Sequence, residues 1–223
     1  TLYTASADGN YHVKDEEKLF RLAGEFGVET ENRDVYDIAH EVAEKGLMEY
    51  GKPFGHQIFT KRAPEYTQEI WDREEIRPRA IDREVSCAMH MTHMGCSSKA
   101  EALIRQALRN GLSDGWGGSM MGTEFSDVLF GTPKEVETEA NLGVMVEENV
   151  NIVVHGHDPS LSEMIVECAE SKEMIDYAKS MGAQGITISG VCCTSNEVAM
   201  RRGIPMAGNF LQQENVVLTG ACE

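Results

Sequence analysis

The stretch NIVVHGHDPSLSEMI, residues 151–165, joins a strand pattern to a helix pattern. A short apolar run at 151–154 predicts a buried strand, and HGHDP is a turn. Asp158 can cap the following helix, and Pro159 suits its first position because that position needs no N–H. We expect this helix to run to Met181.

A second strand and helix follow in the same order. GITISGV at 185–191 predicts a strand, and Cys192 and Cys193 form the turn behind it. Thr194 and Glu197 have the spacing of a capping box, which places the next helix after Thr194. The order strand, helix, strand, helix predicts a parallel βαβ unit.

The first half of the chain is predicted to be helical, because its apolar residues recur every three to four positions. The expected helices are 16–26, 34–50, one beginning at Ile81, and 99–111. A glycine-rich turn at 114–119 and an acidic, loop-like segment at 130–143 should follow them. We predict an α/β fold, with a mostly helical part at 1–145 and the beginning of a Rossmann-like parallel βαβ domain at 146–223.

Several side-chain positions follow from these patterns. Asn32 or Asp34 is the expected N-cap of the second helix, and Cys168 should pack in the core. The expected buried faces are Leu19, Leu22, Ala23 and Phe26 in the first helix, and Val35, Ile38, Ala39, Val42 and Leu47 in the second. A third strand is conceivable around 206–210.

Composition limits the class of partner. The 223 residues carry a net charge of -17 and a sequence pI of about 4.8, which argues against nucleic acid and anionic membranes. We see neither a signal peptide nor an apolar run of the roughly 20 residues that span a bilayer, so we expect a cytoplasmic protein. The six cysteines lack CxxC pairs and are expected to be thiols. Because the chain starts at Thr1 and ends within an apparent helix, we expect an internal piece of a longer protein.

Histidine and cysteine side chains follow the two predicted strands. His155 and His157 follow the first strand, and Cys192 and Cys193 follow the second. Because the carboxyl ends of parallel strands lie at one sheet edge, these turns should meet in space. The helix N-terminus behind each turn should favour thiolate over thiol. Imidazole with thiolate suits iron–sulfur, zinc, nickel or copper.

Plainer interpretations remain open for these residues. His-Gly-His can be a hydrogen-bonded turn, and adjacent cysteines can be small buried residues. Two ligands also leave a tetrahedral site incomplete. A second set, Cys87, His90, His93 and Cys96, is spaced by three residues. On one helix each step of three rotates by about 60°, so these four side chains should not share an ion.

Four motifs together resemble one protein family. They are VHGHDPSLSEMIVE, GITISGVCCTSNEVAMRRGIP, DGWGGSMMGTEFSDVLFGTP and IDREVSCAMHMTHMG. The resemblance, over nearly the whole chain, is to the catalytic subunit of anaerobic nickel–iron carbon monoxide dehydrogenase. It implies a nickel–iron–sulfur cluster of the Ni-4Fe-4S type, whose outer iron is held by His157 and Cys193, with His155 and Cys192 as neighbours.

The resemblance also implies a reaction and partners. CO and water would be oxidised to CO2, two protons and two electrons, which would pass through [4Fe-4S] clusters to a ferredoxin-like acceptor. Those clusters would be bound by parts of the subunit that are missing here, and the full-length protein would be a homodimer. The alternatives are a hybrid-cluster-type hydroxylamine reductase and a non-catalytic metal-binding module. A nucleotide-binding dehydrogenase is disfavoured, because HGHDPS offers a single glycine.

Overall fold

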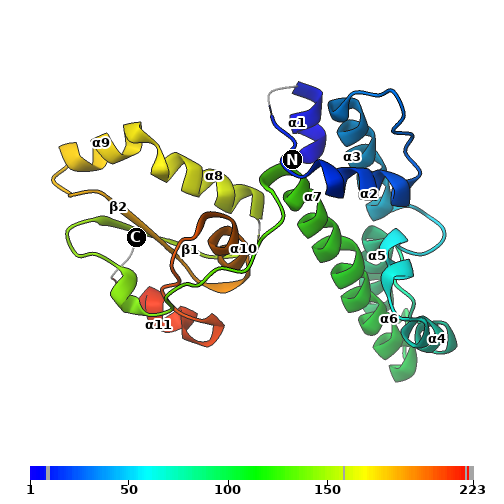
Figure 1. Cartoon of the computed structure of the whole chain (residues 1–223). Coiled ribbons are helices and arrows are strands. Elements are labelled where there is room, and N and C mark those ends of the chain that lie inside the picture. Colours follow the sequence, from blue (N-terminus) through cyan, green and yellow to red (C-terminus); the bar gives the residue numbers. More distant parts are fainter. Residues whose placement is uncertain (9–10, 158, 219, 221–223) are drawn as a thin grey trace. The chain divides into compact units, whose positions relative to one another are not determined.

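The computed structural model describes residues 1–8, 11–157, 159–218 and 220. The chain divides into two compact units, Thr1–Leu129 and Phe130–Glu223 (Figure 1). Among the described residues, no helix combines the length and the apolar character that crossing a membrane requires.

The described part of the first unit is built from helices. They are α1 Leu2–Asp8, α2 Glu16–Phe26, α3 Val35–Gly51, η1 Ile58–Arg62, α4 Glu65–Arg73, α5 Ile81–Thr92, α6 Ala100–Ser113, η2 Asp114–Ser119 and α7 Met120–Phe130. The four predicted helices are therefore confirmed. The sequence analysis missed α1, α4 and α7.

Side-chain caps and apolar faces explain α2 and α3. Asp15 caps α2 by accepting a hydrogen bond from the Lys18 N–H at 2.9 Å, and Asp34 caps α3 through the Tyr36 N–H at 2.8 Å. The predicted apolar face of α2 is buried throughout. Two positions on α3 were wrong: Val35 at its start is only half-buried, and Leu47 near its end is 55% exposed.

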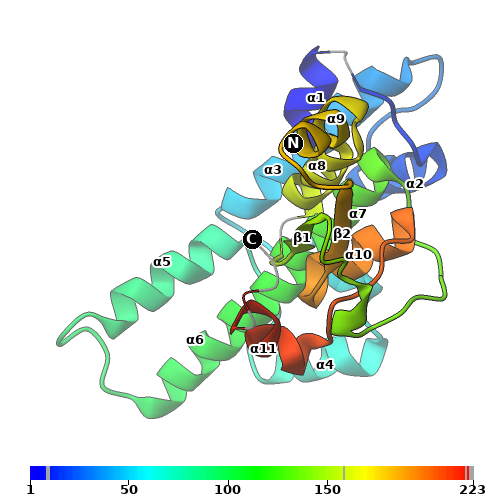
Figure 2. The same ribbon diagram turned by 90° about the vertical axis from the view of Figure 1, so that its left-hand side faces the viewer.

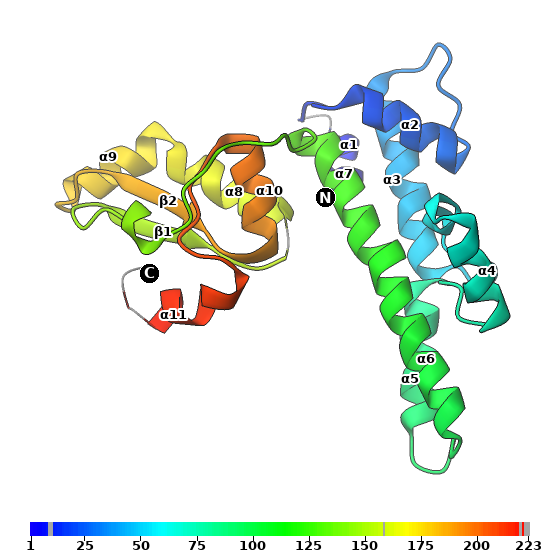
Figure 3. The same ribbon diagram turned by 60° about the horizontal axis from the view of Figure 1, so that its bottom comes forward.

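The predicted glycine-rich turn at 114–119 is instead a π-helix, η2. It continues α6 into α7, so that the three elements form one long rod (Figure 3). Gly117 serves close packing here, because a Cβ on it would lie 2.7 Å from the Gln57 amide nitrogen. Gly111, predicted to end a helix, lies inside α6. Figure 2 shows α5 and α6 side by side as a hairpin.

Gly46 of α3 lies against the Phe125 ring of α7. A Cβ at this position would overlap two ring carbons and would lie 3.3 Å from Met121 Sδ. We expect Gly46→Ala to destabilise the protein by about 1–3 kcal/mol, because the ring must leave its packing. Gly24→Ala is the matched control: a Cβ there meets nothing within 4 Å, so this helical substitution should stabilise by about 0.5–1 kcal/mol. Thermal unfolding measures both stability changes. A change of the same sign in the two variants would contradict the packing argument.

The second unit contains the predicted parallel βαβ unit. Strands β1 Val150–Val154 and β2 Ile186–Gly190 pair in parallel, in a register that runs from Val150 opposite Ile186 to Val154 opposite Gly190. The helices are α8 Pro159–Glu170, α9 Lys172–Ser180, α10 Cys192–Arg202 and α11 Gln213–Leu218, with short 3-10 turns η3 Leu142–Val144 and η4 Phe210–Gln212. The hydrophobic core of the second unit contains Val154, Val166, Ile188, Val198, Ala199, Ile204 and Met206.

Three details of this unit differ from expectation. The single helix expected from Pro159 to Met181 is two helices, because the Ser171 side chain caps α9 by accepting from the Met174 N–H at 3.3 Å. In place of a third strand around 206–210, Met206 forms isolated bridges with Ala140 and Gly190. Cys168 is exposed on α8 and does not pack in the core. The proposed cap Asp158 lies outside the described residues, whereas α8 does begin at Pro159.

Candidate metal centre

The H-G-H turn leaves the carboxyl end of β1 and is held by backbone hydrogen bonds. The Val191 N–H donates to the Val154 carbonyl at 2.9 Å, and the Thr194 N–H donates to the Gly156 carbonyl at 3.0 Å. Gly156 has a φ of 121°, a conformation that side-chain-bearing residues rarely adopt. These features hold the H-G-H turn beside the turn that carries the cysteines, as the parallel topology predicted.

The two cysteines begin α10 directly. Val191 is the N-cap and Cys192 is the first helical residue, so the predicted capping box of Thr194 and Glu197 was wrong. Thr194 lies inside the first turn, and its hydroxyl contacts the Ser162 hydroxyl at 3.1 Å. Cys192 has a φ of 71°, unusual for a residue other than glycine. Such backbone conformations are typical of sites where the surrounding structure constrains a residue.

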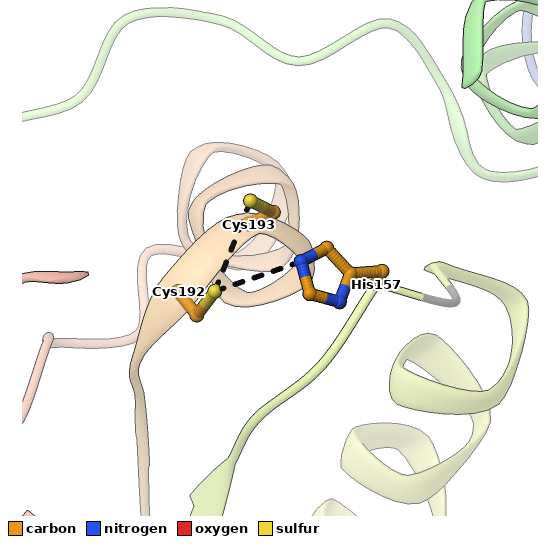
Figure 4. A group of neighbouring side chains, drawn as sticks. All are labelled: His157, Cys192 and Cys193. Carbon is orange, nitrogen blue, oxygen red and sulfur yellow. Dashed lines mark hydrogen bonds between the residues drawn. The ribbon is translucent and has the colours of Figure 1, made fainter. Parts of the chain in front are cut away.

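Three side chains converge between these turns. Cys192 Sγ lies 3.9 Å from His157 Nε2 and 3.8 Å from Cys193 Sγ. One donor atom from each of the three residues lies within 4.8 Å of the others. Figure 4 shows the imidazole reaching from the H-G-H turn toward the two sulfur atoms at the start of α10. Cys192 is 4% exposed, whereas His157 and Cys193 are exposed.

The two thiols influence each other. The hydrogen bond with the Cys192 thiol raises the pKa of the Cys193 thiol. A metal ion that binds Cys193 must therefore displace a proton, which couples metal affinity to pH.

His155 contacts a different part of the unit. Its Nε2 lies 2.8 Å from the Gln213 side-chain oxygen, and both residues line a cavity of about 400 Å³ together with Glu214 and Leu218. The structure therefore separates the two histidines: His157 contacts a thiol, and His155 contacts α11. Sequence reasoning had placed both in the turn without distinguishing their surroundings.

The donor set fits a thiophilic metal. One imidazole nitrogen and two sulfur atoms suit iron, nickel, zinc or copper better than magnesium or calcium. Three protein donors leave at least one tetrahedral position for another ligand. Within the described residues, His157, Cys192 and Cys193 are the group of three or more donors that could hold an ion. The second set, Cys87, His90, His93 and Cys96, is divided by the end of α5 at Thr92, so that His93 and Cys96 lie beyond the helix that carries Cys87 and His90.

Two features of the site were not foreseen in the sequence. Cys192 Sγ lies between the other two donors, although the sequence interpretation assigned it only as a neighbour. The buried contact between Thr194 and Ser162 was also missed. Serine and threonine residues follow both turns in the sequence, and they were the available signal for this contact. The capping-box pattern instead predicted that Thr194 is an N-cap.

Comparisons with known proteins give a consistent result. A profile of the Prismane/CO dehydrogenase family matches residues 2–223. Carbon monoxide dehydrogenase 1 of Methanosarcina acetivorans is 50% identical over 215 residues, which are 96% of this chain and 34% of that protein. A nickel-free crystal structure of carbon monoxide dehydrogenase from Thermococcus sp. AM4 has a TM-score of 0.88 and 47% identity, covering 99% of this chain and 35% of that one.

A second solved structure agrees with the first. Carbon monoxide dehydrogenase IV from Carboxydothermus hydrogenoformans gives a TM-score of 0.86 at 41% identity, covering 99% of this chain and 35% of that chain. The chain thus spans about a third of the length of the relatives that it matches.

Proposed function

The chain belongs to the Prismane/CO dehydrogenase family, and from this premise we propose that it forms part of the catalytic subunit of an anaerobic carbon monoxide dehydrogenase. In this proposal, His157 and Cys193 bind the outer iron of a nickel–iron–sulfur cluster. The convergence of His157, Cys192 and Cys193 at one sheet edge is the observation that carries it.

The donor set supports this cofactor. Iron and nickel both accept thiolate and imidazole ligands, and two of the three donor residues, His157 and Cys193, are exposed. When bound, the cluster would supply the metal chemistry that converts CO and water to CO2, two protons and two electrons. The described relative from Thermococcus is a nickel-free form, which makes nickel the metal to test first.

The protein's own residues would orient the metal ligands and set the charge of the site. His157 offers Nε2 toward the sulfur atoms, and Cys193 releases its proton when it binds a metal. The H-G-H turn is fixed by the hydrogen bond to Gly156, so the imidazole approaches from a set direction. The Cys192 side chain is itself screened from water, whereas His157 and Cys193 are exposed.

The same family includes a second chemistry. A hybrid-cluster-type hydroxylamine reductase was one alternative from the sequence, and a non-catalytic metal-binding module was the other. The similar relatives described above are named carbon monoxide dehydrogenase at 41–50% identity, which favours CO oxidation.

The proposal extends to partners and organisation. Electrons would leave through [4Fe-4S] clusters, bound elsewhere in the subunit, to a ferredoxin-like acceptor, and the intact protein would be a cytoplasmic homodimer. We also propose that residues 1–145 belong to a helical domain and that residues 146–223 begin a Rossmann-like domain. Limited proteolysis of the intact protein would locate that boundary.

The test is a comparison of two substrates. The intact protein, purified without oxygen, should reduce a viologen dye when CO is added and should contain both nickel and iron. Hydroxylamine should be reduced much more slowly. Rapid hydroxylamine reduction by a nickel-free, iron-containing protein would overturn the proposal in favour of the hybrid-cluster alternative.

A further inference from the structure

We propose that Thr194 is a positioning residue that sets the separation between the H-G-H turn and the cysteine pair. The proposal deepens the proposed function and rests on it. Thr194 directly follows Cys193 in the first turn of α10, and it forms bonds with both the H-G-H turn and α8.

Two hydrogen bonds carry this inference. The Thr194 N–H donates to the Gly156 carbonyl at 3.0 Å, and its Oγ1 lies 3.1 Å from Ser162 Oγ. Gly156 directly precedes His157, and Ser162 lies in the first turn of α8. One residue therefore holds the segment that contains His157 at both of its ends.

Burial makes this arrangement rigid. Thr194 is 2% exposed and Ser162 is 5% exposed, so water has little access to the contact between their hydroxyl groups. A buried hydroxyl that loses one of its hydrogen bonds costs free energy, and the two helix N-termini can then move apart. Metal-binding side chains must be held within about 0.5 Å of their productive positions, so a small movement here weakens metal binding.

The position of the helix start excludes the other role for this threonine. An N-cap residue uses its side chain to satisfy free N–H groups at the beginning of a helix. Because α10 begins at Cys192, Thr194 is two residues inside the helix. Its hydroxyl is directed to α8 instead, which links the two turns that carry the metal donors.

The main test replaces the hydroxyl by a methyl group of similar shape. In the intact protein depleted of metal, Thr194→Val should weaken Fe²⁺ binding by His157 and Cys193 about tenfold, at the lower end of the effect of residues that orient metal ligands. Thr194→Ser keeps the hydroxyl and should restore most of the affinity. Ser162→Ala removes the same contact from α8 and should have a similar effect, while the double variant should lose little more than either single variant.

Thr60 provides the matched control. It is also 2% exposed, and its hydroxyl donates to the Gln57 carbonyl at 2.7 Å in the first unit. Thr60→Val should lower thermal stability and leave the Fe²⁺ dissociation constant unchanged. Hydrogen–deuterium exchange of residues 153–157 and 160–163 in metal-depleted protein should accelerate in Thr194→Val and not in Thr60→Val.

The outcomes separate this inference from the proposed function. If the parent protein binds neither nickel nor iron, both fail. If the parent binds iron and Thr194→Val and Ser162→Ala both bind it equally well, the positioning role of Thr194 is overturned while the proposed function stands. If Thr194→Val does not fold, the effect of Ser162→Ala on iron affinity decides.

Discussion

In the intact protein, His157→Ala is expected to lower CO-dependent dye reduction by more than about 100-fold, since removal of residues that merely orient ligands already costs 10–100-fold. The side chain contributes the nitrogen donor of the group, with Nε2 3.9 Å from Cys192 Sγ. Alanine removes that donor from an exposed position, so the fold should persist. The rate of viologen reduction and the iron content per protomer are the measurements.

His155→Ala is the control for this prediction. It removes the same side chain from the same turn, two residues away, but His155 contacts Gln213 and lies outside the donor group. We expect this variant to keep most of its activity and its metal. Equal losses in the two variants would mean that the turn as a whole matters and that His157 has no special role.

Cys193→Ala should cause a loss of the same order. Its sulfur is one of two in the group, and the resemblance to carbon monoxide dehydrogenase assigns it to the outer iron. Cys168→Ala is the matched control, because Cys168 is an exposed thiol on α8 outside the group. Near-parental activity of Cys193→Ala would leave Cys192 as the sulfur donor and would contradict the assignment made from the sequence.

The topology around the site followed from the sequence, because short apolar runs that end in polar turns have few alternative structures. Both strands and their parallel pairing were confirmed. Since parallel strands end at one edge, the meeting of His157 with the cysteine pair required no further information. The prediction of a turn at 114–119 was wrong for a physical reason. Glycine permits turns, but it also permits close helix packing, as at Gly117.

The details of the site could not be predicted, because they depend on backbone angles. The positive φ of Cys192 starts α10 two residues before the expected cap and directs its sulfur toward His157. No local pattern signals such a conformation in a residue other than glycine. The resemblance singled out His157, but the contact of His155 with Gln213, 58 residues away, could not be predicted from the H-G-H motif. A short sequence motif gives no information about contacts of this kind with distant residues.

The ion pairs behind the site lead to the second large prediction, which concerns stability. Glu163 of α8 bonds to both Arg201 and Arg202 at the end of α10, at 3.1 and 2.7 Å. The side chains of Glu163 and Arg201 are only 2% and 4% exposed. Removal of one partner of a buried pair typically costs about 3–5 kcal/mol, and the lower end applies here because Arg201 keeps Glu197 at 3.4 Å. We expect Glu163→Ala to destabilise the packing of α8 on α10 by this amount.

Native-state hydrogen exchange of the intact protein measures this loss where it occurs, because it reports the local opening of each helix. A loss of 3 kcal/mol corresponds to about 100-fold faster exchange of the protected amides in α8 and α10. Glu167→Ala is the control, since Glu167 is one turn further along α8 and also pairs with Arg202, but its side chain is 62% exposed. Exposed pairs contribute roughly 0–1 kcal/mol, so exchange should change by less than about fivefold. Similar rates in the two variants would show that burial adds nothing to this pair, and that apolar packing of Val166 and Val198 alone holds α8 and α10 together.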